Sequence, residues 1–174
     1  WGKLSWSSQM SLSATFDNML KRVVQLKKWT ESFELPKSMW ISGLFNPQSF
    51  LTAAMQVSSR ARGIALDKMT IETVVTDYDE AKEVQDYPQE GVYVHGLFIE
   101  GGRWNKEEKV LEESRLKELQ PRMPVVLIKP VPIAKEWEAT SAGYLRKESG
   151  LYECPVYSTS MRGGTFLFLA TLSC

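Results

Sequence analysis

Apolar residues recur every three or four positions in the first part of the chain, which is the spacing of one face of an α-helix. Between Ser11 and Trp29 these apolar residues alternate with polar ones, and most of the lysines lie off the apolar stripe. The stripe consists of Leu12, Phe16, Met19, Leu20, Val23 and Leu26. The pattern predicts an amphipathic helix, and Pro36 lies beyond its end, where it would prevent continuation.

A second amphipathic helix is predicted from Pro47 to the residue before Gly63. Asn46 can accept a hydrogen bond from the unpaired N–H groups of the first turn, and Pro47 has the backbone angle that this turn requires. Gly63 can adopt the left-handed conformation that ends a helix. We expect one face of this helix to be buried, and its apolar members are Phe50, Leu51, Ala54, Met55 and Ala61.

Beyond Gly63 the sequence alternates and is rich in β-branched and aromatic residues, which predicts strands. The candidate strands cover residues 67–78, 92–99, 125–131, 152–157 and 165–172. The charged segment 105–120 is compatible with a short helix or a solvated loop. Pro155 cannot donate to a ladder, so we expect it on an edge strand or at a bulge. The order predicts an α+β fold, in which N-terminal amphipathic helices precede a small antiparallel β-barrel or sandwich.

The length of 174 residues corresponds to about one domain, with a helical part at 1–63 and a β part at 64–174. The 21 basic residues balance the 21 acidic ones, which argues against nucleic acid or an anionic membrane as a partner. No apolar stretch has the length of a membrane span. The two cysteines, Cys154 and Cys174, do not make a disulfide framework or a zinc site.

His95 is the only histidine, and it lies within "EGVYVHGLFIEGGRW". A metal site would need partners of defined type, and the sequence has no second histidine to share a metal. Strand alternation places His95 on the face of Tyr93, Leu97 and Ile99. We therefore expect a structural strand residue with one ring nitrogen hydrogen-bonded. The phosphate-loop, zinc-protease and nucleophile-elbow motifs are absent from the sequence.

Two other groups of reactive side chains favour structural interpretations. The acidic cluster lacks the spacing and central glycine of an EF-hand, so we expect a solvated loop. Its members are Asp77, Asp79, Glu80, Glu83 and Asp86. Cys154 has no basic neighbour in sequence that would lower the pKa of its thiol.

The tryptophans at the ends of predicted elements are candidates for packing against a partner. These are Trp29, Trp40 and Trp104. Large aromatic side chains dominate both cores and interfaces, so the sequence leaves these two roles open.

Four segments carry a resemblance to a known family. They are "WISGLFNPQSFLTAAMQVSSRARGIALDKM", "EGVYVHGLFIEGGRW", "LKELQPRMPVVLIKPVP" and "YECPVYSTSMRGGTF". Together they resemble the C-terminal domain of dynein heavy chains, most closely the axonemal, outer-arm beta type. The likeness runs over nearly the whole sequence.

The resemblance implies a non-catalytic regulatory or structural module that packs on the ring of AAA+ ATPase modules of the same heavy chain. The parent motor would bind ATP and Mg, act on microtubules and assemble with other dynein subunits, whereas this fragment would hold no cofactor, metal or catalytic residue. The implied location is the cytoplasm and cytoskeleton, in the axoneme of a cilium or flagellum. Family members continue past the strand equivalent to residues 165–172 into a further apolar strand. The resemblance therefore leaves undecided whether the barrel closes in a sequence that ends at Cys174. The alternative hypothesis is a free-standing small β-barrel binding module, with a cavity lined by residues such as Tyr93, Leu97 and Phe168.

Overall fold

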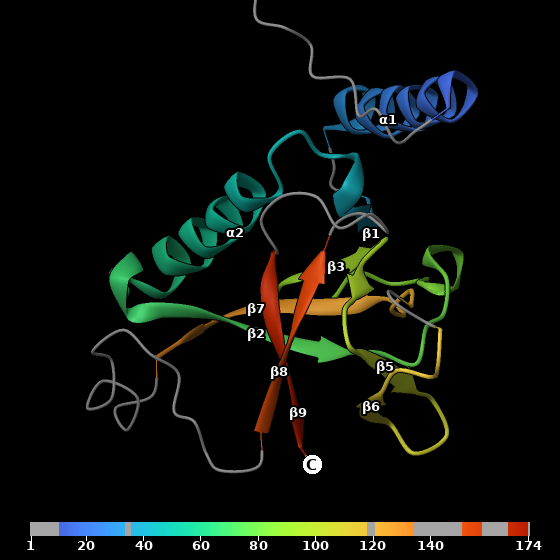
Figure 1. The fold of residues 1–174 in the computed structure, drawn as a ribbon. Helices are drawn as coiled ribbons and strands as arrows, with labels where there is room; N and C mark the ends of the chain where they lie inside the picture. Colours follow the sequence, from blue (N-terminus) through green and yellow to red (C-terminus); the bar gives the residue numbers. More distant parts are fainter. Residues whose placement is uncertain (1–10, 34–35, 118–120, 134–150, 158–166, 174) are drawn as a thin grey trace, which may run out of the picture. The chain divides into compact units, whose positions relative to one another are not determined.

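The computed structural model describes residues 11–33, 36–117, 121–133, 151–157 and 167–173. The protein divides into two compact units, residues 1–36 and residues 37–174 (Figure 1). The described residues of the first unit form one long helix. The described residues of the second unit form a further helix, three short 3₁₀ helices and all the described strands. The 3₁₀ helices are η1 (Ile41–Gly43), η2 (Leu66–Lys68) and η3 (Ala81–Glu83).

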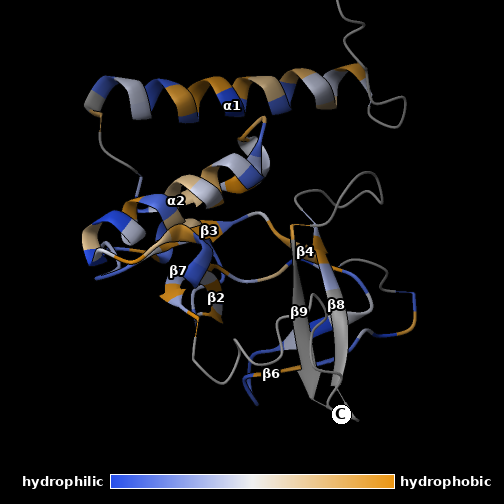
Figure 2. Ribbon diagram, turned by 90° about the vertical axis from the view of Figure 1, so that its left-hand side faces the viewer, coloured by the Kyte–Doolittle hydropathy of each residue, from blue (hydrophilic) through white to orange (hydrophobic). Residues whose placement is uncertain are grey.

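The helix of the first unit, α1 (Leu12–Ser32), confirms the first predicted helix and extends beyond Trp29. The Ser11 hydroxyl caps it by accepting a hydrogen bond from the Ala14 N–H, at 3.2 Å. Phe33 ends it in the left-handed conformation, with φ of 55°. Apolar and polar segments alternate along the ribbon (Figure 2). Most of the predicted stripe is exposed, namely Leu12, Phe16, Met19, Leu20 and Val23.

The second helix, α2 (Pro47–Arg62), begins and ends where the sequence predicts. The Asn46 side chain accepts a hydrogen bond from the Ser49 N–H at 3.0 Å, and Gly63 has φ of 64°. The predicted packing face is only partly right. Leu51 is buried, with 3% of its surface exposed, but Phe50 is half-buried and Ala61 is exposed. The buried face is therefore turned toward Leu51 and Ser59, where the Ser59 hydroxyl donates to the Ile64 carbonyl at 2.5 Å.

No described helix combines the length and the apolar character that crossing a membrane requires.

A four-stranded sheet forms the centre of the second unit. Its strands lie in the order β1 (Ser38–Trp40), β3 (Val92–His95), β7 (Val126–Pro132) and β2 (Met69–Val75). β1 and β3 are parallel, whereas β7 is antiparallel to both β3 and β2. The register places the fully buried side chains on one face of the sheet. They include Met39, Val94, Val126 and Ile128.

Two smaller sheets complete the described strands. A three-stranded antiparallel sheet has the order β4 (Phe98–Ile99), β8 (Leu151–Tyr157) and β9 (Phe168–Ser173). A two-stranded ribbon pairs β5 (Gly102–Asn105) with β6 (Val110–Glu113). The three-stranded sheet is joined to the rest of the unit by backbone hydrogen bonds, among them Met123 N–H to the Leu97 carbonyl at 2.9 Å. The Gln48 amide of α2 also donates to the Leu167 carbonyl, at 3.1 Å.

The α+β class is confirmed, but the expected antiparallel barrel is not formed by the described strands. They belong to three separate sheets, and the largest sheet is mixed because β1 runs parallel to β3. The predicted strand 92–99 is broken at Gly96, which has φ of 78°, so β3 and β4 enter different sheets. Consequently His95 does not share a face with Leu97 and Ile99 as predicted: Leu97 is fully buried and His95 is half-buried.

Pro155 lies in β8, the central strand of its sheet, and not at an edge as expected. The register with β9 is continuous through Pro155, so no bulge is present there. A proline is tolerated because β4 pairs only with Val156 and Tyr157. Its carbonyl still accepts a hydrogen bond from the Glu100 N–H, at 3.0 Å.

Gly91 should be intolerant of any side chain. It has φ of 84°, and an added Cβ would overlap the carbonyl oxygen of Ile128 on the neighbouring strand. We expect Gly91→Ala to lower the free energy of unfolding by at least about 3 kcal/mol. Gly63→Ala is the matched control, because Gly63 also has positive φ but open space at its Cβ, and it should cost about 1 kcal/mol. Equal costs in urea denaturation would contradict this interpretation.

The buried face of α2 can be tested by comparing two neighbouring residues. Leu51→Ala should cost about 2–5 kcal/mol because it leaves a cavity under the helix. Phe50→Ala should cost about 1–2 kcal/mol, since part of the ring already contacts water. Chemical denaturation of both variants measures the difference, and a larger loss for Phe50 would show that the helix packs on the other face.

Candidate functional site

The three candidate tryptophans occupy three different elements. Trp29 lies in the last turns of α1, in the first unit, whereas Trp40 ends β1 and Trp104 lies in β5. All three are half-buried. Their roles as partner-packing residues stay predictions, but the surroundings of Trp40 and Trp104 show what holds each one in place.

Trp40 lies against the backbone of the turn that follows β3. A Cβ at Gly96 would come within 2.6 Å of its Cδ1 and 2.7 Å of its Nε1, so the indole ring is packed over the glycine. The Ser42 hydroxyl donates to the Gly96 carbonyl at 2.6 Å and fixes the same turn. Trp40 is therefore positioned by a close approach that requires glycine at position 96.

His95 is the partner of Trp40 in the β1–β3 register, and its ring is engaged in the structure. Its Nδ1 lies 2.8 Å from the Ser38 hydroxyl, which confirms the expectation of one hydrogen-bonded ring nitrogen. Burial, and to a smaller extent the positive charge of Arg122, lowers the pKa of His95 to about 4. The imidazole is consequently neutral at neutral pH.

These two residues belong to a half-exposed side of the four-stranded sheet, which we call the outer face. Register places the following residues on it: Ser38, Trp40, Thr70, Glu72, Val74, Tyr93, His95, Leu127, Lys129 and Val131. Val74 is 38% exposed and Glu72 is exposed, whereas the others are half-buried. Tyr93 packs edge-to-face with Tyr78, with ring centroids 6.0 Å apart. Half of these ten residues are apolar or aromatic, and Glu72 lies opposite Lys129 across the strands.

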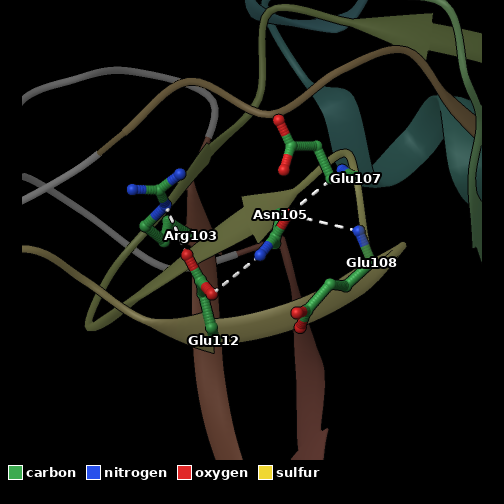
Figure 3. Close-up of polar contacts among 5 residues, drawn as sticks. All are labelled: Arg103, Asn105, Glu107, Glu108 and Glu112. Carbon is green, nitrogen blue, oxygen red and sulfur yellow. Dashed lines mark hydrogen bonds and ion pairs between the residues drawn. The ribbon is translucent and has the colours of Figure 1, made fainter.

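Trp104 lies in the β5–β6 ribbon. Much of this ribbon falls within residues 105–120, for which the sequence was compatible with a short helix or a solvated loop. Trp104 is opposite Leu111, and its indole N–H is buried without a hydrogen-bond partner among the described residues. Arg103 forms an ion pair with Glu112 at 2.9 Å. The Asn105 amide nitrogen donates to the same carboxylate at 3.1 Å (Figure 3).

The turn of this ribbon is held by Asn105 as well. Its side-chain oxygen accepts hydrogen bonds from the N–H groups of Glu107 at 3.0 Å and Glu108 at 3.3 Å (Figure 3). This is the turn chemistry for which asparagine is favoured. The charged residues between Gly102 and Glu113 therefore form a two-stranded ribbon, and Lys109 has the left-handed conformation in its turn.

The acidic cluster is engaged by lysines. Lys109 pairs with Asp77 at 2.8 Å and Lys106 pairs with Asp79 at 2.5 Å, so the ribbon turn is joined to the loop after β2. The hydrogen bond to Asp79 raises the pKa of Lys106, as expected for a paired ammonium. Glu83 accepts a hydrogen bond from the Asp79 N–H at 2.9 Å. Within the described ranges, no three His, Cys, Asp or Glu side chains converge in a way that could hold a metal ion.

Part of the predicted chemistry falls outside what the structure describes. Cys174 lies beyond the described residues, and for Cys154 only the backbone, in β8, is described. The alternative hypothesis expected Leu97 and Phe168 to line a cavity inside a barrel. Leu97 is fully buried, and the side chain of Phe168 is outside what the structure describes.

The described elements define an α+β domain with a mixed central sheet and a half-exposed outer face. The sequence pattern that defines the family of C-terminal domains of dynein heavy chains matches residues 1–174, and the protein belongs to this family.

Individual relatives are ciliary and axonemal dyneins. The sequence is 42% identical over 172 residues to the ciliary dynein beta chain of Heliocidaris crassispina and 41% identical over 172 residues to human dynein axonemal heavy chain 17. It is 38% identical over 172 residues to the beta chain of the flagellar outer arm of Chlamydomonas reinhardtii. Each alignment covers 99% of this sequence but only 4% of the relative, so the sequence spans a small part of the length of such heavy chains.

The neutral state of His95 should make stability depend on pH. Below pH 6.5 the unfolded protein binds a proton at this residue while the folded protein does not, until the pH approaches 4. Stability is therefore complete above pH 6.5 and falls between pH 6.5 and 4. We expect a loss of about 1–2 kcal/mol between pH 7 and pH 5, a range above the titration of most carboxylates.

His95→Asn is the control, because its amide can take the place of Nδ1 beside Ser38 but does not titrate. Urea denaturation at each pH should show a flatter profile for this variant. An unchanged profile would assign the pH dependence to other groups.

Proposed function

We propose that this protein is a non-catalytic packing module at the C-terminal end of an axonemal dynein heavy chain, resting on the ring of AAA+ ATPase modules of the same polypeptide. The observation that carries the proposal is the likeness to ciliary and axonemal heavy chains along the whole sequence. In this proposal the helical part at 1–63 and the β part at 64–174 act together as one module.

The outer face of the four-stranded sheet is the surface that we assign to this packing. It combines aromatic side chains, Trp40 and Tyr93, with aliphatic ones such as Leu127. Aromatic residues are enriched and charged residues depleted at the centres of protein interfaces. Its charged pair, Glu72 and Lys129, lies toward the β2 edge, in keeping with the polar rim of an interface.

The proposed role is mechanical because the reactive side chains are already used in structure. His95 is neutral and hydrogen-bonded, and Asp77 and Asp79 are paired with lysines. ATP and Mg would be bound by the ATPase modules of the parent motor, and microtubules and other dynein subunits would be bound through the parent polypeptide. A rigid plate in contact with several modules would couple their relative movements. The working location would be the axoneme of a cilium or flagellum, with no nucleic acid or membrane as a partner.

Val74→Glu tests the packing surface in the intact heavy chain. The substitution places a charge on the outer face at an exposed position, so it should leave the module folded but weaken its contact with the ring. Val110→Glu is the matched control, since Val110 is 42% exposed on the β5–β6 ribbon. We expect V74E, but not V110E, to change the microtubule-gliding velocity and to increase protease cleavage of the module.

The outcome that counts against the proposal is equal behaviour of the two variants. ATP hydrolysis by the purified 174-residue protein at a motor-like rate would separately contradict the non-catalytic role.

A further inference from the structure

Arg122 is an exposed cation on a backbone that the core holds in place. It forms an isolated antiparallel bridge with Phe98, so the side chains of these two residues lie on the same side of the backbone. Their neighbours Met123 and Ile99 lie on the other side and are buried, with 2% and 0% of their surfaces exposed. The guanidinium is therefore directed to the surface by the same contacts that bury Met123 and Ile99.

The positive charge of Arg122 acts on the outer face of the four-stranded sheet. Burial lowers the pKa of His95, and the charge of Arg122 is the second cause of this shift. His95 is the register partner of Trp40, and Tyr93 lies two residues earlier on the same face. Arg122 therefore borders the part of the outer face that carries its aromatic side chains.

The carboxylates around Arg122 have other partners. Arg122 contributes to the lowered pKa of Glu80, but the hydrogen bond from Lys82, at 2.8 Å, is the larger cause. Asp77 and Asp79 are paired with the lysines of the ribbon turn. Within the described part of the polypeptide, the Arg122 guanidinium itself forms no hydrogen bond or ion pair. It is a cation at the border of the outer face that water alone satisfies.

We propose that Arg122 anchors the outer face to a carboxylate of the ATPase ring against which this face packs. The inference rests on the proposed function and names the chemistry of the partner at one point of that surface. A guanidinium can donate two parallel hydrogen bonds to a carboxylate, which fixes orientation as well as distance. Tryptophan, tyrosine and arginine are also the residue types that carry most of the binding energy at protein interfaces. Trp40 and Tyr93 supply contact area, and Arg122 supplies the polar anchor.

Desolvation explains why the partner must present an acceptor at this point. Covering the outer face takes Arg122 out of water, and a guanidinium that loses water without gaining an acceptor is costly. His95 is neutral, so it adds no second positive charge beside Arg122. A single aspartate or glutamate opposite the β1–β3 end of the sheet therefore neutralises this border of the interface.

The first experiment is cross-linking in the intact heavy chain. Arg122→Lys introduces an amine that a water-soluble carbodiimide joins to a carboxylate in contact with it. We expect mass spectrometry to find an amide bond between position 122 and an aspartate or glutamate of the ring. Arg115→Lys is the matched control and should give no such product, because Arg115 is also exposed but lies beyond β6 and off the outer face. No cross-link from position 122, or a cross-link to Glu80 only, would overturn the proposal.

The second experiment measures protease cleavage of the module in the same intact heavy chain. Arg122→Glu should increase the cleavage rate about tenfold because it opposes two negative charges, whereas Arg122→Lys should stay within about threefold of the unaltered protein. Arg115→Glu should leave the rate unchanged, and circular dichroism checks that each variant is folded. An effect of Val74→Glu without an effect of Arg122→Glu would overturn this inference and leave the packing surface standing. Loss of both effects would count against the packing surface itself and against this inference with it.

Discussion

The close contact between Trp40 and Gly96 fixes the point at which the polypeptide leaves one sheet for another. At this point β3 ends in the four-stranded sheet and β4 begins in the three-stranded sheet. The left-handed backbone of Gly96 permits the change of direction, and the indole ring fills the space where a Cβ would lie. The next residue, Leu97, is fully buried and accepts the Met123 N–H through its carbonyl. The relative placement of the two sheets therefore depends on one residue without a side chain.

The polar groups around this junction are used to hold backbone and side chains in place. Ser42 donates to the Gly96 carbonyl, and Ser38 lies beside the ring of His95. Neutral His95 then stays in a half-buried position without the cost of burying a charge. This use of reactive groups in structure is consistent with a domain whose surface is suited to contacting other protein. The family relationship gives the setting in which such contacts would matter.

Elements that carry their own local signals could be predicted from the sequence. Asn46 and Gly63 begin and end α2 as their capping chemistry predicts, and the five alternating segments all contain strands. The strands that could not be predicted form through contacts with other parts of the polypeptide. β1 has only three residues and is a strand because it pairs with β3, more than fifty positions later. The β5–β6 ribbon has a charged sequence, and its strands are stabilised by cross-strand pairs that periodicity does not detect. Strand alternation also fails beyond Gly96, where the polypeptide passes from one sheet to another. The prediction that His95 shares a face with Leu97 and Ile99 is therefore wrong.

The two lysine–aspartate pairs connect the turn of the ribbon to the loop after β2 at two separate points. With one pair broken, the turn can rotate about the other, but it can move away only when both are broken. All four side chains are more than half exposed, so dissolved ions weaken both pairs together. Screening of charges does not act on the uncharged contacts of the hydrophobic core. Ionic strength thus acts on the orientation of the ribbon turn while the sheets stay unchanged, which gives this part of the domain a mechanical compliance of its own.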